Sequence, residues 1–295
     1  MQSQDEEPRG LFPTSRIAVD VGFTEGPVIA QDGWLWFVSL DQRCIYRVRP
    51  SGADLERIAD VGGGPNGLAE LADGSFVIAQ NSGFPPGAGL DGTGSGAQFL
   101  HPDGTFGWLS EEMVAPNDIC VGPDGYVYLT DPTRKHERDD GRIWRLDVQT
   151  GDAAMLAHVP WYPNGLGFGL QDDGLYVADT RNARIVTMPL QGDRLGPEET
   201  LFDMGPLRPD GFAFDVDGNI LVGAISLADG AIGEVQHWSA EGEQLDRLEL
   251  GPGRFYTNFA LGSDGTLFVT ASDEGAVLRS DDWSPAGLAL HPFRH

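Results

Sequence analysis

Six stretches of the chain repeat one pattern of apolar and polar positions. Each has an apolar run, a polar turn that ends in Gly, and a second apolar run rich in β-branched and aromatic residues. The copies occupy residues 24–39, 65–80, 116–131, 163–179, 209–224 and 256–271. Short apolar runs bounded by turn residues favour β-strands over helices. The pattern predicts that each copy is a pair of adjacent antiparallel strands.

The Asp-Gly pairs within these copies indicate hairpin turns, because such turns need a positive φ that Gly adopts without steric cost. Residues 44–59 and 141–157, which follow the first and third copies, also read as strand, turn and strand. The remainder of each period therefore supplies an outer pair of strands. Six units of four strands predict an all-β fold, a six-bladed β-propeller.

A polar residue near the start of each copy gives the period. These residues are Glu25, Asn66, Asn117, Asn164, Asp210 and, in the sixth copy, Thr257 or Asn258. Their spacing of 41 to 51 residues is the length of a propeller blade. A solenoid rarely needs two hairpins per period, and paired β-sandwiches would not repeat evenly. We expect residues 11–295 to form one propeller domain, closed by pairing of 15–21 with the last blade, after a disordered N-terminus at 1–10.

The longest period contains an insertion at residues 81–99. Its Gly and Pro content predicts a surface loop without regular structure. The GTGSG within it is similar to part of a phosphate-binding loop, but no Lys-Ser or Lys-Thr follows and no helix pattern starts there. We therefore expect a rim or lid loop.

The net charge of −26 limits the partners of the chain. Nucleic acid and anionic membranes would be repelled before any specific contact formed. We therefore expect a small-molecule substrate, and we expect neither nucleic acid nor a membrane as a partner. The sequence leaves the oligomeric state open. Cys44 and Cys120 cannot make a disulfide framework, and residues 1–10 lack the basic and apolar segments of a signal peptide. A cytoplasmic location is expected.

The polar residues that begin the six copies are candidate metal ligands. The innermost strands of a propeller run the same way, so their first residues form a ring at one end of the central channel. Carboxylate and amide oxygens suit Ca²⁺ first and Mg²⁺ or Mn²⁺ second. Asn and Asp before Gly are also ordinary turn residues. The matched position across blades, and the poor turn former Glu25, favour a site.

The chain resembles the family of senescence marker protein 30, gluconolactonases and luciferin-regenerating enzymes. The resemblance rests on TEGP, APNDI, YPNGL and RPDGF and covers nearly the whole chain. It implies one divalent metal ion, Ca²⁺ first with Mg²⁺, Mn²⁺ or Zn²⁺ as alternatives, held by Glu25, Asn164 and Asp210. It also implies that Asn117 contacts metal or substrate, and that Asp210 is the catalytic general base.

Other residues near the ring are secondary candidates. Asn66, Tyr162 and Tyr256 are expected to contact substrate, although core packing explains the aromatic residues, Trp161 included, almost as well. Asp131 is expected to make a structural hydrogen bond. His101 and His136 are weaker candidates for a catalytic histidine. GxSxG is absent, and HERDD at 136–140 lacks the second His of HExxH.

The sequence therefore predicts a metal-dependent hydrolase that opens a lactone, either a sugar lactone or a similar small cyclic ester. The metal would stabilise the oxyanion, and Asp210 would take a proton from water. Two alternatives stay open. The same site could act on another carbonyl substrate as an ester hydrolase or isomerase, or the propeller could be a non-catalytic scaffold.

Overall fold

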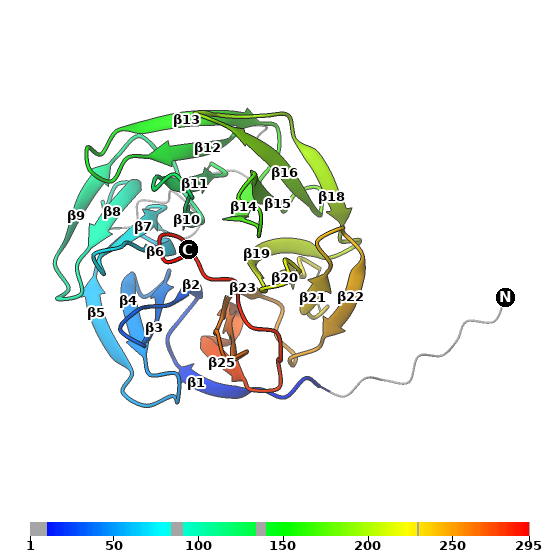
Figure 1. Cartoon of the computed structure of the whole chain (residues 1–295). Coiled ribbons are helices and arrows are strands. Elements are labelled where there is room, and N and C mark those ends of the chain that lie inside the picture. The colour runs from blue at the N-terminus through cyan, green and yellow to red at the C-terminus, as the bar shows by residue number, and fades with distance from the viewer. Residues whose placement is uncertain (1–10, 84–90, 134–139, 229, 295) are drawn as a thin grey trace.

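Six antiparallel sheets surround a central channel in the computed structural model, which describes residues 11–83, 91–133, 140–228 and 230–294 (Figure 1). This confirms the predicted all-β six-bladed propeller. Blade 1 contains β2 (Thr24–Ile29), β3 (Leu35–Ser39), β4 (Cys44–Val48) and β5 (Glu56–Asp60). Blade 2 contains β6 (Pro65–Glu70), β7 (Phe76–Gln80), β8 (Gly96–Leu100) and β9 (Phe106–Ser110). Blade 3 contains β10 (Ile119–Val121), β11 (Val127–Asp131), β12 (Gly141–Leu146) and β13 (Ala153–Val159).

The second half of the ring has one blade with an additional strand. Blade 4 contains β14 (Pro163–Phe168), β15 (Gly174–Asp179) and β16 (Arg184–Gln191), and β16 pairs with both β17 (Arg194–Leu195) and β18 (Glu199–Asp203). Blade 5 contains β19 (Arg208–Phe214), β20 (Ile220–Ile225), β21 (Glu234–Trp238) and β22 (Gln244–Leu248). Blade 6 contains β23 (Tyr256–Leu261), β24 (Leu267–Ala271), β25 (Ala276–Ser280) and, from the N-terminal side, β1 (Ser15–Val19). A short 3₁₀ turn (Ser272–Glu274) joins β24 to β25.

The ring closes by the predicted pairing of the N-terminal strand with the last blade. β1 runs antiparallel to β25, from Ser15 opposite Arg279 to Val19 opposite Ala276. Figure 1 shows the two ends of the propeller meeting at this strand pair. One sheet therefore contains both the first and the last strand of the chain, which fixes all six blades in a closed ring.

The predicted hairpin turns are present. Gly33, Gly74, Gly125, Gly218 and Gly265 have positive φ. In the fourth copy Asp172 adopts the left-handed conformation instead (φ 54°), while Gly174 begins β15. Asp tolerates this conformation because its short side chain can bond locally. All six turns lie at the same end of the channel, opposite the ring of polar residues.

The insertion at 81–99 is partly strand, which corrects the prediction of a loop throughout. Residues 96–99 belong to β8, where Ala97 pairs with Ala79 and Phe99 with Val77. Pairing to a buried neighbour strand overrides the local Gly content of this segment. Residues 84–90 lie outside the described residues.

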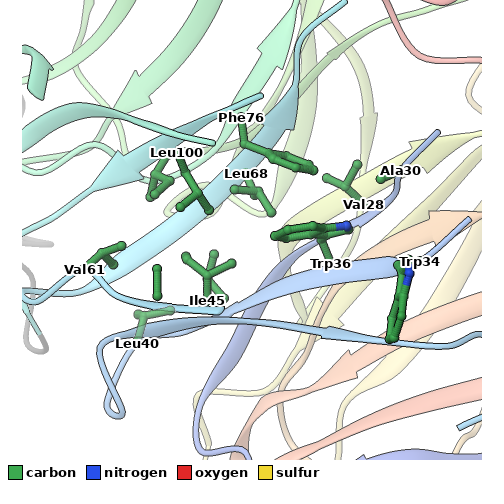
Figure 2. Close-up of a cluster of buried hydrophobic side chains, with 13 residues drawn as sticks. Val28, Ala30, Trp34, Trp36, Leu40, Ile45, Val61, Leu68, Phe76 and Leu100 are labelled. Carbon is green, nitrogen blue, oxygen red and sulfur yellow. The ribbon is translucent and has the colours of Figure 1, made fainter. Parts of the chain in front are cut away.

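The core consists of apolar clusters between neighbouring blades. Figure 2 shows the cluster between blades 1 and 2, where Trp36 lies over Phe76 with ring centroids 4.5 Å apart. Both cysteines are free, as expected. None of the described residues belongs to a helix long and apolar enough to cross a membrane.

Candidate metal centre

The polar ring residues sit where the innermost strands begin. The register of these strands shifts at the ring positions in five blades, for example between Glu25 and Val28 and between Pro209 and Phe212. By this register Thr257 matches Glu25 and Asp210, and Asn258 matches the residue after them. The structure thus places Thr257 in the ring and Asn258 one position further into the channel.

The residue after the ring position is Gly in four blades: Gly26, Gly67, Gly165 and Gly211. The neighbouring inner strands come so close here that a side chain would collide with the next blade. A Cβ on Gly165 would lie 2.6 Å from the carbonyl oxygen of Asp210, and one on Gly26 would lie 2.7 Å from that of Asn66. Glycine therefore allows the six strand starts to converge.

The two other blades carry polar side chains at this position, and the two side chains meet. They are Asp118 in blade 3 and Asn258 in blade 6, on opposite sides of the channel (Figure 1). Asn258 donates from its side-chain nitrogen to an Asp118 carboxylate oxygen at 3.3 Å. This hydrogen bond spans the channel directly below the ring.

Three carboxylates share this region, of which Glu25 and Asp210 are buried and Asp118 is half-buried. Burial, with the negative charges of Asp210 and Asp118, raises the pKa of Glu25 well above its usual value. Burial and then the charge of Asp118 raise the pKa of Asp210 to about 7, and burial raises that of Asp118 to about 6. Within the part of the chain that the structure describes, none of the three forms an ion pair. The groups that lower these pKa values are neutral hydrogen-bond donors, among them the Asn164 amide at Asp210.

The structure brings the predicted metal ligands together. Glu25, Asn164 and Asp210 are buried, and Asn117 is half-buried with its side chain hydrogen-bonded to the phenol of Tyr162. Burial and the charge of Asp210 raise the pKa of that phenol, which therefore stays protonated at neutral pH. Asn66 is buried at the ring position of blade 2.

Aromatic candidates other than Tyr162 belong to the core. Tyr256 is fully buried in the cluster between blades 5 and 6, where its hydroxyl accepts from the Gly253 N–H at 3.1 Å. A structural role thus replaces the substrate contact expected for Tyr256. Trp161 is also buried and donates its indole N–H to Glu198 at 2.7 Å.

The remaining candidates lie away from the ring. Asp131 makes the structural bonds that were predicted, accepting from the Val114 and Ala115 N–H groups at 2.9 Å each. His101 lies in the β8–β9 turn at the far end of the molecule and packs against Phe99, so the structure does not place it with the ring. His136 falls outside the described residues.

The donor set fits a hard divalent cation. No group of three or more His, Cys, Asp or Glu side chains in the described ranges is arranged to hold an ion. A cation at the ring would therefore need amide oxygens of Asn117 and Asn164 beside the carboxylates of Glu25 and Asp210. Such all-oxygen sets are typical of Ca²⁺ sites, and a bound cation would offset the repulsion between the carboxylates.

The sequence interpretation missed Asp118. Its signal is present as PND in blade 3 where three other blades have PNG or PDG. Four other blades have Gly at this position because their inner strands approach closely, so a side chain here is directed into the channel. The close approach of the strands is seen in the structure and not in the sequence.

Comparison with known proteins identifies the family and agrees with the fold. The model of the SMP-30/gluconolactonase/LRE-like region matches residues 23–273. A gluconolactonase of Zymomonas mobilis is 26% identical over 307 residues, covering 91% of this chain and 81% of that protein. A gluconolactonase structure from Xanthomonas campestris gives a TM-score of 0.74 at 19% identity, over 93% of this chain and 89% of that one.

A second solved structure, the calcium-binding protein regucalcin from Agrobacterium tumefaciens, gives a TM-score of 0.76 at 20% identity, over 94% of this chain and 95% of that one. At this identity the structural likeness speaks for the fold alone. The match over residues 23–273, most of the chain, goes further: the protein belongs to the SMP-30/gluconolactonase/LRE-like family.

Proposed function

We propose that this protein is a divalent-metal-dependent lactonase, with Ca²⁺ as the first candidate ion. The substrate would be a sugar lactone or a similar small cyclic ester. Similarity to a gluconolactonase over most of both chains supports the reaction class. The calcium-binding neighbour and the all-oxygen donor set support the choice of ion.

One observation carries the proposal: buried carboxylates converge at one end of the channel without a cation from the chain's described part to balance them. Burying unpaired charge is costly, and proteins tolerate it where a metal or a reaction requires it. Glu25 and Asp210 each raise the energy of the other's ionised form, as the elevated pKa of Glu25 reflects. A non-catalytic scaffold has no need of such an arrangement.

The residues of the ring have different proposed roles. Glu25, Asn164 and Asp210 would hold the ion, and Asn117 would hold the ion or the substrate. Tyr162 orients the Asn117 side chain through its hydroxyl. When bound, a hard divalent ion polarises a carbonyl and stabilises the negative charge that forms on its oxygen.

Asp210 is the proposed general base. In the metal-free protein, burial and the charge of Asp118 raise its pKa to about 7. A bound cation would lower this pKa, so that the carboxylate would be ionised and able to accept a proton at neutral pH. Lactone opening requires a proton to leave the attacking water. We assign this role to Asp210, because Glu25 receives hydrogen bonds from Thr257 and from the Gly26 N–H, whereas Asp210 receives one from the Asn164 side chain.

The test is hydrolysis of glucono-δ-lactone and of uncharged γ- and δ-lactones by purified protein, followed by proton release. The protein is first stripped with a chelator and then reloaded separately with Ca²⁺, Mg²⁺, Mn²⁺ or Zn²⁺. We expect about one ion per chain and activity only after reloading. Asp172→Asn, at the opposite end of the channel, is the matched control for loss of one carboxylate.

Two results would overturn the proposal in different ways. Metal binding without hydrolysis of any lactone would keep the site and reject the reaction. Full activity in the stripped protein, with no metal detected by elemental analysis, would reject the metal dependence.

A further inference from the structure

Below the ring, the central channel widens into a cavity of about 340 Å³, which we call the lower chamber. Its wall comes from the innermost strand of every blade. At the ring end, Asp118 and Asn258 line the chamber and are hydrogen-bonded to each other across the channel. This pair separates the lower chamber from the ring residues.

The C-terminal segment 287–294 lines the lower chamber. Figure 1 shows this end of the chain near the centre of the ring of blades. The segment is held by backbone hydrogen bonds from Gly287 to Gly262 and from Leu288 to Phe214, each 2.9 Å. Gln31 and Leu290 line the chamber yet are exposed, so the chamber reaches solvent beside this segment. A small molecule can therefore enter from the end opposite to the ring.

The chamber wall combines aliphatic side chains with phenylalanine rings and carries carboxylates at both ends. Five phenylalanines line it: Phe168, Phe212, Phe214, Phe259 and Phe293. The two carboxylate residues in the lining are Asp118 next to the ring and Glu70 near the C-terminal segment. Aromatic faces and carboxylates both attract cations, whereas the apolar walls disfavour a hydrated metal ion.

The two basic residues of the C-terminal segment do not neutralise these carboxylates. The Arg294 guanidinium donates to the Asp172 carboxylate at 3.0 Å and to the carbonyl oxygens of Gly169 and Leu170. His291 contacts the same carboxylate at 2.9 Å. Both residues line the chamber, but their polar groups are engaged by the β14–β15 turn and neither is hydrogen-bonded to Asp118 or Glu70 among the described contacts.

We infer that the lower chamber binds a small organic cation, an alkylammonium or quaternary ammonium group with an apolar body. Its size falls in the range of small-molecule pockets. The phenylalanine rings would contact the apolar body and the cation, and Asp118 and Glu70 would provide the opposite charge. The chamber borders the candidate metal centre at Asp118, but the inference does not depend on the lactonase proposal.

The experiment compares choline with 3,3-dimethylbutan-1-ol, its neutral isostere, by calorimetric titration of the full chain. Ca²⁺ is kept saturating, so that the organic cation cannot occupy the ring. We expect choline to bind at least about tenfold more tightly than the alcohol, since the two differ only in charge. Benzyltrimethylammonium, with more apolar surface, should bind more tightly than choline.

Two charge-removing variants test the carboxylates with little change of shape. Asp118→Asn and Glu70→Gln should each weaken choline binding by about tenfold and leave binding of the alcohol unchanged. Asp193→Asn, which removes an exposed carboxylate outside the lining, should leave choline affinity within about twofold. Repeating the titration in Asp210→Asn, which damages the ring, should not alter choline affinity.

Three outcomes would overturn the inference. Equal binding of choline and the alcohol would mean an apolar cavity without selectivity for charge. Binding of neither would mean a chamber filled by water. Choline binding that is seen in a parallel titration without Ca²⁺ but is lost at saturating Ca²⁺, or that is lost in Asp210→Asn, would place the cation at the ring instead. None of these results depends on whether a lactone is hydrolysed.

Discussion

The two ends of the central channel are built by the same six strands but differ in chemistry. At the ring end the first residues are Glu25, Asn66, Asn117, Asn164, Asp210 and Thr257, all of them polar. A few residues further along the same strands, the channel is lined by Leu68, Leu166, Phe168, Phe214 and Phe259. The fold places both sets at the axis, so the difference between them reflects the residues and not the backbone.

The fold is stabilised by the apolar residues of the lower channel but not by the carboxylates of the ring. Apolar side chains in the lower channel stabilise the propeller simply by being buried. Carboxylates at the ring end have raised pKa values and so destabilise the ionised, metal-free protein. A polar ring that the fold does not need points to a ligand, and the following predictions test the difference between the two ends.

The largest effect is expected at Asp210. Asp210→Ala removes both a proposed metal ligand and the proposed base, so kcat/KM for a lactone should fall by about 10³-fold or more. Asp210→Asn keeps an oxygen ligand but removes the base, and should lose about 10²–10⁴-fold with metal content preserved. Proton-release kinetics and elemental analysis on the same samples measure both. An Asp210→Ala enzyme that keeps a tenth of its activity would contradict the assignment.

A large effect on stability is expected where the ring strands converge. In Gly165→Ala the new Cβ would lie 2.6 Å from the Asp210 carbonyl oxygen and 2.8 Å from the Gly211 Cα, both backbone atoms that cannot move aside freely. We expect a loss of about 2–4 kcal/mol in the free energy of unfolding. Urea denaturation measures it.

The control for this prediction is Gly192→Asn, in a turn where a Cβ meets no atom within 4 Å and φ is +67°. Asn tolerates this conformation, so the loss should stay below about 1 kcal/mol. Equal losses in the two variants would show that convergence at the ring does not constrain Gly165.

The repeat pattern predicted most of the fold because the propeller is specified locally. Apolar runs and Gly-containing turns recur in each unit, and each blade needs only its own strands and its neighbour. The prediction was wrong at residues 96–99, where Gly96 suggested loop and pairing with β7 made a strand. Pairing partners far along the chain cannot be read from local composition.

The candidate site was predictable only in part. Glu25, Asn164 and Asp210 share one position of the repeat, so the sequence brought them together. Asp118 was missed because its importance depends on the close approach of neighbouring strands, which a repeat alignment does not contain. Tyr256 was expected at the substrate because it precedes a ring position, but its side chain turns into the core between blades.

A smaller effect is expected in the pH dependence of stability, which arises from the carboxylates at the ring end. In the metal-free protein, burial raises the pKa of Asp118 to about 6 and, with the charge of Asp118, that of Asp210 to about 7. Both folded pKa values lie above those of the unfolded chain. This contribution to stability is therefore complete below about pH 4 and is lost as pH rises through 6 to 7.

Calcium must displace the protons of its carboxylate ligands Glu25 and Asp210, so its affinity should increase by at least about tenfold per pH unit between pH 5 and 7. Thermal unfolding with and without Ca²⁺ should accordingly show a larger metal-induced shift at pH 8 than at pH 5. Asp118→Asn, which removes one titrating group, should reduce the pH dependence. Equal stabilisation by Ca²⁺ at both pH values would mean that the ion does not bind among these carboxylates.

The smallest effect is expected at the end opposite the ring. Asp172 has a left-handed backbone (φ 54°) that Asn also adopts readily, so Asp172→Asn removes the charge without straining the turn. The variant weakens the partly exposed contacts to Arg294 and His291. A loss of about 0.5–1 kcal/mol in the free energy of unfolding is expected from urea denaturation.

Lactonase kcat/KM should stay within about twofold of the wild type in Asp172→Asn, because the Asp118–Asn258 pair and the lower chamber separate this turn from the ring. A clear fall in kcat/KM, with the fold intact by circular dichroism, would mean that the C-terminal segment and the ring are energetically coupled. The two ends of the channel would then act as one site, in which the polar ring and the apolar lower chamber have different roles.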